Sequence, residues 1–205
     1  MALSKIQPAS MDLTANYAFT GTNSISSIEY AEKKLDTVTA SSSSTLSFTT
    51  NIDSTYNIYK FRFINMHPSA YEELGFQGST DGGSNYNTQI TSTFFQDYNL
   101  EDNSGQGISY LTGYDQANGT NFQRLNYSTY TDNDSNLCGE LFIFDPSSTT
   151  FVKHFTARTS EHINNAASDA YAAGYFNTTS AINAIQFKME SGTIDSGTIE
   201  MYGIN

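Results

Sequence analysis

The sequence contains no tryptophan, only three prolines and a single cysteine, Cys138. A lone cysteine excludes an internal disulfide, and we expect Cys138 to be a small buried residue. No run of about 18 apolar residues is present, which argues against a membrane-spanning helix. The opening segment MALSKIQPASMDLTANYAF also lacks the apolar stretch of roughly 7 to 15 residues that secretory signals contain. The sequence therefore predicts neither membrane insertion nor a signal peptide.

Basic residues are also scarce, with 9 Lys and Arg against 21 Asp and Glu, for a formal net charge of -12. Nucleic-acid binding requires clustered Lys and Arg side chains that neutralise phosphates, and here the basic residues are scattered. Attraction to an anionic membrane surface requires the same kind of cluster. Both partners are therefore disfavoured, and the acidic surface is expected to repel polyanions.

Alternation of apolar and polar residues is the dominant pattern along the chain. In IQFKME, residues 185–190, the apolar side chains Ile185, Phe187 and Met189 fall on one face, as in a half-buried strand. Similar patterns occupy residues 45–50, 56–66, 73–79, 138–144, 151–157 and 198–204, and weaker ones lie near 17–30, 92–98, 107–112 and 121–127. Helix is expected at most for a turn or two within 160–174, where Asn, Ser and Gly oppose it.

These patterns predict an all-β protein of roughly ten strands, folded as an antiparallel, jelly-roll-like β-sandwich. A chain of 205 residues fits one domain, which we place at residues 21–205 behind an extended N-terminal arm, residues 1–20. GELFIF and FVKHF, on either side of DPSSTT, form the clearest predicted hairpin. The doubled SGTI in SGTIDSGTIEMYGIN is interpreted as two turns of a closing hairpin, with Ile194 packed beneath it.

Residue patterns typical of catalysis are weak. The sequence has no nucleophile elbow in a strand-to-helix setting, and His67, His154 and His162 lack the spacing of a catalytic triad or a zinc site. Paired carboxylates for glycoside hydrolysis are recognised by their separation in space, which leaves that alternative open. We expect no enzyme activity and no cofactor.

Two segments are candidates for ligand binding. TDNDSN places Asp132, Asp134 and Asn136 at alternating positions, like the first half of a calcium loop, but the glycine and the distal glutamate of such a loop are missing. An acidic hairpin loop is the alternative interpretation. The tyrosine-rich middle could present stacking surfaces to sugars or an interface to proteins, or could fill the sandwich. Its members are Tyr98, Tyr110, Tyr114, Tyr127 and Tyr130.

Several stretches together resemble a group of tailed-bacteriophage virion proteins common in marine phages. They are ALSKIQPAS, DLTANYAFTGT, YKFRFINMHPSAYEELGFQGSTDGGSNY, GELFIFDPSSTTFVKHF and AINAIQFKMESGTIDSGTIEMYGIN, which span nearly the whole chain. The resemblance implies a jelly-roll β-sandwich with a structural role, either decorating the capsid or forming a compact fibre head. It also implies assembly as a homotrimer, and it supplies no catalytic residues.

Together these observations predict a non-enzymatic virion structural protein, made in the host cytoplasm and placed on the particle exterior. The N-terminal arm is the expected anchor to capsid or tail proteins. A receptor-binding module that recognises host-surface glycans through the tyrosine-rich segment between residues 98 and 130 is the first alternative. A polysaccharide-degrading enzyme is the second.

Overall fold

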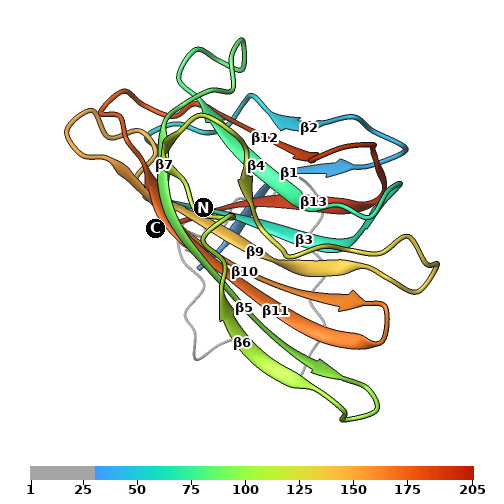
Figure 1. The fold of residues 1–205 in the computed structure, drawn as a ribbon. Helices are drawn as coiled ribbons and strands as arrows, with labels where there is room; N and C mark the ends of the chain where they lie inside the picture. Colours follow the sequence, from blue (N-terminus) through green and yellow to red (C-terminus); the bar gives the residue numbers. More distant parts are fainter. Residues whose placement is uncertain (1–30) are drawn as a thin grey trace, which may run out of the picture. The chain divides into compact units, whose positions relative to one another are not determined.

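Residues 31–205, which the computed structural model describes, form thirteen β-strands and no helix (Figure 1). The strands are β1 (Lys33–Thr39), β2 (Leu46–Phe48), β3 (Ile58–Pro68), β4 (Leu74–Ser79), β5 (Ile90–Leu100), β6 (Gln106–Tyr110), β7 (Ala117–Gly119), β8 (Gln123–Arg124), β9 (Leu137–Phe144), β10 (Lys153–Ile163), β11 (Ala166–Phe176), β12 (Ala184–Met189) and β13 (Ile194–Ile204). None of these residues belongs to a helix that could cross a bilayer. The predicted arm, residues 1–20, and the weak strand near 17–30 lie outside the described residues.

The strands form two antiparallel sheets, which confirms the predicted β-sandwich. The large sheet has the order β1-β13-β3-β9-β10-β11-β5-β6, with β7 also paired to β5, and the small sheet has the order β2-β12-β4-β8. Strands β1 to β4 alternate between the two sheets along the chain, and so do β8, β9, β12 and β13. These eight strands form a jelly roll with β1-β13-β3-β9 in one layer and β2-β12-β4-β8 in the other.

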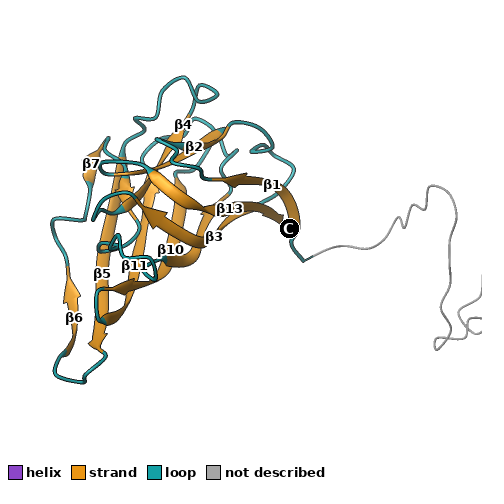
Figure 2. Cartoon of the chain, turned by 90° about the vertical axis from the view of Figure 1, so that its right-hand side faces the viewer, coloured by secondary structure: helices purple, strands orange, loops and turns teal. Residues whose placement is uncertain are grey.

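The other five strands extend the large sheet beyond β9. Strands β5, β6 and β7 are inserted between β4 and β8, and β10 and β11 are inserted between β9 and β12. As a result, the β5–β6 end of the large sheet lies away from the small sheet (Figures 1 and 2). Residues 111–130 pack over part of the inner face of this extension, for example where the Tyr114 ring lies 5.0 Å from the Phe94 ring.

Phenylalanine rings join the two sheets of the jelly roll. Phe187 from β12 lies 5.4 Å, centroid to centroid, from both Phe61 and Phe63 of β3 in the opposite sheet. Its neighbours in the small sheet, Phe48 and Phe76, lie 6.1 and 6.5 Å away. All five rings are buried. The alternating positions of the predicted strands therefore form one aromatic centre, because successive side chains in a strand point to opposite faces.

The chain end differs from the predicted hairpin. Strand β12 pairs with β2 and β4, whereas β13 pairs with β1 and β3, so the connection between them passes from one sheet to the other. The first SGTI makes this crossing. The second is a β-bulge within β13, where Gly197 has φ of 116° and a Cβ at this position would lie 2.7 Å from Met66 Cα. Ile194 is buried, as predicted.

The sequence predicted one of the two long hairpins of the large sheet and missed the other. The predicted hairpin around DPSSTT is confirmed, because β9 and β10 pair in antiparallel register from Phe155 with Ile143 onward. The possible helix within 160–174 is wrong, since this segment is the β10–β11 hairpin. Asn164 occupies its turn with φ of 53°, a left-handed conformation that asparagine tolerates. Pairing with neighbouring strands outweighs the weak local preference of this alanine-rich segment.

The TDGGSN turn after β4 is organised by one carboxylate. Asp81 accepts hydrogen bonds from the Ser79 hydroxyl at 2.6 Å, the Asn85 amide side chain at 2.7 Å and the Asn85 backbone N–H at 2.9 Å. These donors lower the pKa of Asp81 to about 2, so the side chain stays ionised over the physiological range. Gly82 and Gly83 follow with positive φ values, which glycine adopts without strain.

Candidate functional site

A pocket of about 360 Å³ opens where β5 ends, beside the β10–β11 turn. Its walls include Tyr98 from β5 and Tyr127 and Tyr130 from the segment before β9. Gln96 also lines the pocket, and Asn164 and Asn165 contribute from the turn. Its lining residues, all within the described range, include no Asp, Glu, Lys or Arg. Aromatic walls with a few amide groups are typical of ligand pockets.

Strand periodicity places Gln96 and Tyr98 on the same, inner face of β5. Across the strand pair, Tyr98 lies opposite Gly107 of β6. A Cβ at position 107 would lie 3.2 Å from the Tyr98 ring, closer than most such contacts. The missing side chain therefore gives the Tyr98 ring room to lie over β6 beside the pocket.

Three of the five predicted tyrosines, Tyr98, Tyr127 and Tyr130, meet at this pocket. Tyr110 instead projects from the outer face of β6, because it pairs with Phe95 rather than Gln96, and its hydroxyl donates a hydrogen bond to Asp115. Tyr114 lies behind the pocket, with its ring stacked 6.0 Å from that of Tyr127. The sequence grouped the five residues, and the sheet separates them onto two faces.

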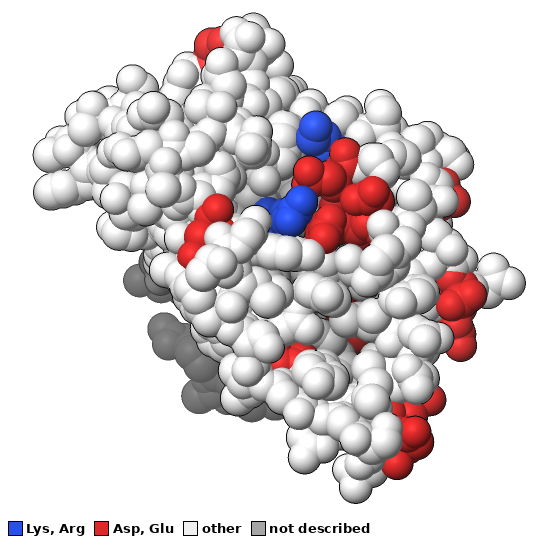
Figure 3. Space-filling model, viewed as in Figure 1, with Lys and Arg blue, Asp and Glu red and all other residues white. Residues whose placement is uncertain are grey.

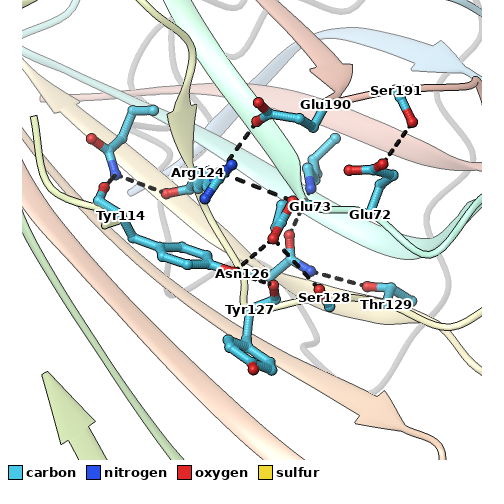
Figure 4. Close-up of polar contacts among 12 residues, drawn as sticks. Glu72, Glu73, Tyr114, Arg124, Asn126, Tyr127, Ser128, Thr129, Glu190 and Ser191 are labelled. Atoms are coloured by element: carbon cyan, nitrogen blue, oxygen red, sulfur yellow. Dashed lines mark hydrogen bonds and ion pairs between the residues drawn. The ribbon is translucent and has the colours of Figure 1, made fainter. Parts of the chain in front are cut away.

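A polar cluster fastens the segment that contains Tyr114 and Tyr127 to the small sheet (Figure 4). The Tyr114 hydroxyl donates to Glu73 Oε1 at 2.6 Å. Arg124 Nε lies 3.9 Å from Glu73 Oε2 and 3.2 Å from Glu190 Oε2. The Arg124 guanidinium also lies 4.5 Å from the centre of the Tyr114 ring, within the range of a cation–π contact.

Burial, followed by the neighbouring Glu73 carboxylate, raises the pKa of Tyr114 above its ordinary value. The phenol therefore remains a hydrogen-bond donor at neutral pH. Acidic side chains lie beside the few basic groups on this face of the molecule, as Figure 3 shows. Arg124 compensates the charge of Glu73 and Glu190, and the adjacent residues Glu72 and Glu73 have separate partners, since Glu72 accepts from Ser191.

A second, deeper network holds the next residues of the segment. The buried Glu161 carboxylate of β10 accepts from the Asn126 side chain at 2.6 Å, the Tyr127 backbone N–H at 2.9 Å and the Thr129 hydroxyl at 3.1 Å. Asn126 also accepts from the Leu74 backbone N–H at 2.7 Å. Burial raises the pKa of Glu161, and the three donors act in the opposite direction. Asn126 therefore connects β4 of the small sheet to β10 of the large one.

The calcium-like segment closes as a turn. The Ser135 backbone N–H donates to the Asp132 carbonyl at 2.9 Å, and the Asn136 carbonyl accepts from the His162 N–H at 3.1 Å. Asp132 and Asp134 are exposed. Within residues 31–205, no group of three or more His, Cys, Asp or Glu side chains is arranged to hold a metal ion. Calcium binding at Asp132, Asp134 and Asn136 thus stays a weak sequence-based prediction.

The three histidines also have separate surroundings. His67 Nε2 lies 3.2 Å from the Asp132 carbonyl oxygen, His162 Nδ1 lies 3.0 Å from the Ser135 hydroxyl, and the His154 ring lies 5.8 Å from that of Tyr175. Cys138 is half-buried, with Sγ 3.3 Å from the Asn65 backbone nitrogen, rather than fully buried as expected.

Sequence reasoning missed Gln96 and the asparagines of the β10–β11 turn. A signal for Gln96 was present, because Ile90, Ser92, Phe94 and Gln96 alternate along one strand and the first three face inward. A glutamine at the next inward position is a buried polar group that requires a partner. No comparable signal marked Asn164 and Asn165, because their segment resembled a weak helix.

No protein-family profile, curated protein or solved structure matches this chain. Chemically, the pocket combines aromatic faces, amide groups and hydroxyls on well-anchored elements. Such an arrangement can bind and orient a ligand.

Proposed function

We propose that this chain is a non-enzymatic structural protein on the exterior of a tailed-bacteriophage particle, where copies associate through the outer face of the extended sheet. An apolar surface on three adjacent strands carries the proposal; its side chains are exposed in β5 and β6 and half-buried in β11. We call it the outer patch; it consists of Phe95 in β5, Ile108 and Tyr110 in β6, and Tyr171 in β11.

Three large apolar or aromatic side chains of the outer patch are exposed to solvent, whereas side chains of this kind are usually buried. Phe95 is 41% exposed, Tyr110 56% and Ile108 78%. The rings of Phe95 and Tyr171 stack at 4.8 Å with an interplanar angle of 11°, which gives the patch a rigid centre. A contiguous apolar surface bordered by polar groups is characteristic of a protein–protein interface.

The border of the outer patch is polar. Arg158 pairs with Asp169 beside Tyr171, and its guanidinium lies 5.4 Å from the centre of that ring. A shallow hollow of about 430 Å³, lined in part by Asp97, Ile108 and Asp169, adjoins the patch. Protruding apolar side chains beside a hollow suit contact with a second copy of the same chain.

Three further features support this role. The resemblance to virion proteins implies a homotrimer, the jelly roll occurs among viral capsid proteins, and the net charge of -12 disfavours a place against packaged DNA. In this proposal, residues 1–20 attach the protein to its capsid or tail partner. The outer patch then joins neighbouring copies.

Self-association is tested with Ile108→Glu. We expect the wild-type protein to have the mass of a trimer at micromolar concentration by light scattering, and the variant to be monomeric, because the new carboxylate would be buried without a partner. Thr156→Glu is the matched control, since it adds the same charge at an exposed position of the same face, on β10. A monomeric wild type, or a trimer that withstands Ile108→Glu, would contradict the assembly proposal.

Exterior location is tested on intact particles with gold-labelled antibodies raised against the protein. We expect labelling without prior opening of the particle, at regular positions on the capsid or at the tail. Labelling that requires disrupted particles would contradict an exterior location. Antibodies against a known exterior protein and against an internal protein of the same particle serve as controls.

A further inference from the structure

We propose that the pocket between Tyr98, Tyr127 and Tyr130 binds an uncharged saccharide. This site lies on the inner side of β5, whereas the outer patch lies on the opposite face of the same strand. The proposal is independent of self-association. It adds a recognition function to the proposed exterior protein.

The wall of the pocket contains a buried polar group without a partner among the described residues. Gln96 is only 7% exposed and lines the pocket, yet its side-chain oxygen has no hydrogen-bond partner among the described residues. Such groups are rare in folded proteins because each loses its hydration without compensation.

A ligand that carries hydroxyl groups satisfies the Gln96 amide. A hydroxyl both donates and accepts, so it can pair with either the oxygen or the nitrogen of the amide. Asn164, Asn165 and Ser109 add further donors and acceptors around the pocket. A saccharide carries several closely spaced hydroxyls. These hydroxyls can pair with the several polar side chains that surround this small pocket.

Two of the tyrosine rings around the pocket are held in place by neighbouring rings. Tyr98 is 36% exposed, so part of its ring is open to solvent beside the pocket. Tyr130 packs edge-on against Tyr71 with ring centroids 4.4 Å apart, and Tyr127 stacks on Tyr114. Both rings are therefore held before a ligand arrives, which reduces the entropy lost on binding. Fixed aromatic faces suit the apolar C–H faces of a sugar ring.

The charge and the size of the pocket favour a small, neutral ligand. Because the lining contains no Lys or Arg, it offers no charged partner for the carboxylates or sulfates of acidic glycans. The net charge of -12 further disfavours them at long range. A volume of about 360 Å³ is near the lower limit of typical ligand pockets, which fits one or two sugar units rather than a long chain.

The test begins with an array of neutral and acidic oligosaccharides, followed by calorimetric titration of the neutral oligosaccharide that gives the strongest signal. We expect the wild-type protein to bind neutral glycans, and Tyr98→Ala to weaken binding by about tenfold or more. Gln96→Leu is expected to weaken binding similarly, because it removes the amide and keeps the side-chain volume. Tyr98 is partly exposed, so replacing it disturbs the folded structure less than replacing the buried Gln96 does.

Tyr175→Ala is the matched control, because it removes the same ring from the outer face of β11, at a position outside both the pocket and the outer patch. It should leave both glycan affinity and self-association unchanged. Three results would overturn the saccharide proposal: no glycan bound on the array, acidic glycans bound exclusively, or equal affinity of wild type and Tyr98→Ala. Each result is separate from failure of the assembly proposal, which Ile108→Glu tests.

Discussion

Replacement of Phe187 by alanine is expected to lower the free energy of unfolding by about 3 to 5 kcal/mol. Phe187 is fully buried, and its ring lies 5.4 Å from Phe61 and from Phe63 across the two sheets. Alanine would remove the ring from the middle of this aromatic cluster and leave a cavity that the paired β-strands cannot close by moving. Aromatic pairs contribute about 0.5 to 1.5 kcal/mol beyond the buried area, so the upper part of the range is expected.

Urea denaturation followed by circular dichroism measures this effect, since the midpoint should fall with little change in the slope. Phe151→Ala is the control, because Phe151 is 70% exposed in the loop before β10 and its loss should change stability by no more than about 0.5 kcal/mol. Equal stability of the two variants would show that the Phe187 ring does not join the two sheets.

The second large effect is expected for Asn126→Leu, which keeps the approximate volume of the side chain and removes its polar atoms. Asn126 is fully buried and makes three hydrogen bonds, accepting from Leu74 N–H at 2.7 Å and donating to Glu161 at 2.6 Å and to Thr129 at 3.1 Å. Leucine would leave the Leu74 N–H and one carboxylate oxygen of Glu161 with fewer partners in a buried site.

We expect Asn126→Leu to reduce the free energy of unfolding by about 3 to 5 kcal/mol, because it weakens the compensation of a buried carboxylate and leaves a donor unsatisfied. Thermal unfolding checks this value. Asn121→Leu is the control, since Asn121 lies in the same segment with an exposed side chain. If both variants unfold at the wild-type temperature, the Asn126 network does not hold the segment against β10.

The sequence predicted those strands in which burial alternates cleanly. In β10, residues Lys153, Phe155, Ala157, Thr159 and Glu161 are buried and the residues between them are exposed. The alternation of apolar and polar residues is visible in the sequence from 151 to 157. It weakens beyond Ala157, because the inward positions there hold the polar residues Thr159 and Glu161. The segment that continues through Ala166 and Ala170 offered no clear period, and only pairing with β5 and β10 makes it a strand.

The candidate site was partly predictable for a similar reason. The tyrosine-rich segment was recognised as a possible sugar-binding or interface region from residue type alone. Which tyrosine faces which side depends on strand register, since a shift by one residue turns every side chain to the other face. The pairing of Phe95 with Tyr110 and of Tyr98 with Gly107 separates the outer patch from the pocket. Register depends on how two strands pair, so the sequence of one strand alone does not determine it.

The sequence by itself determined the all-β class and the confirmed β9–β10 hairpin, because these depend on short-range alternation and turn residues. It also established the acidic charge and the absence of an internal disulfide. Only the tertiary structure decided that the doubled SGTI connects two sheets, and that β10, β11, β5 and β6 extend one of them. Only the tertiary structure placed Gln96 beside Tyr127 and Tyr130. These outcomes depend on contacts between distant residues, whose energies are set by burial and pairing in the folded chain.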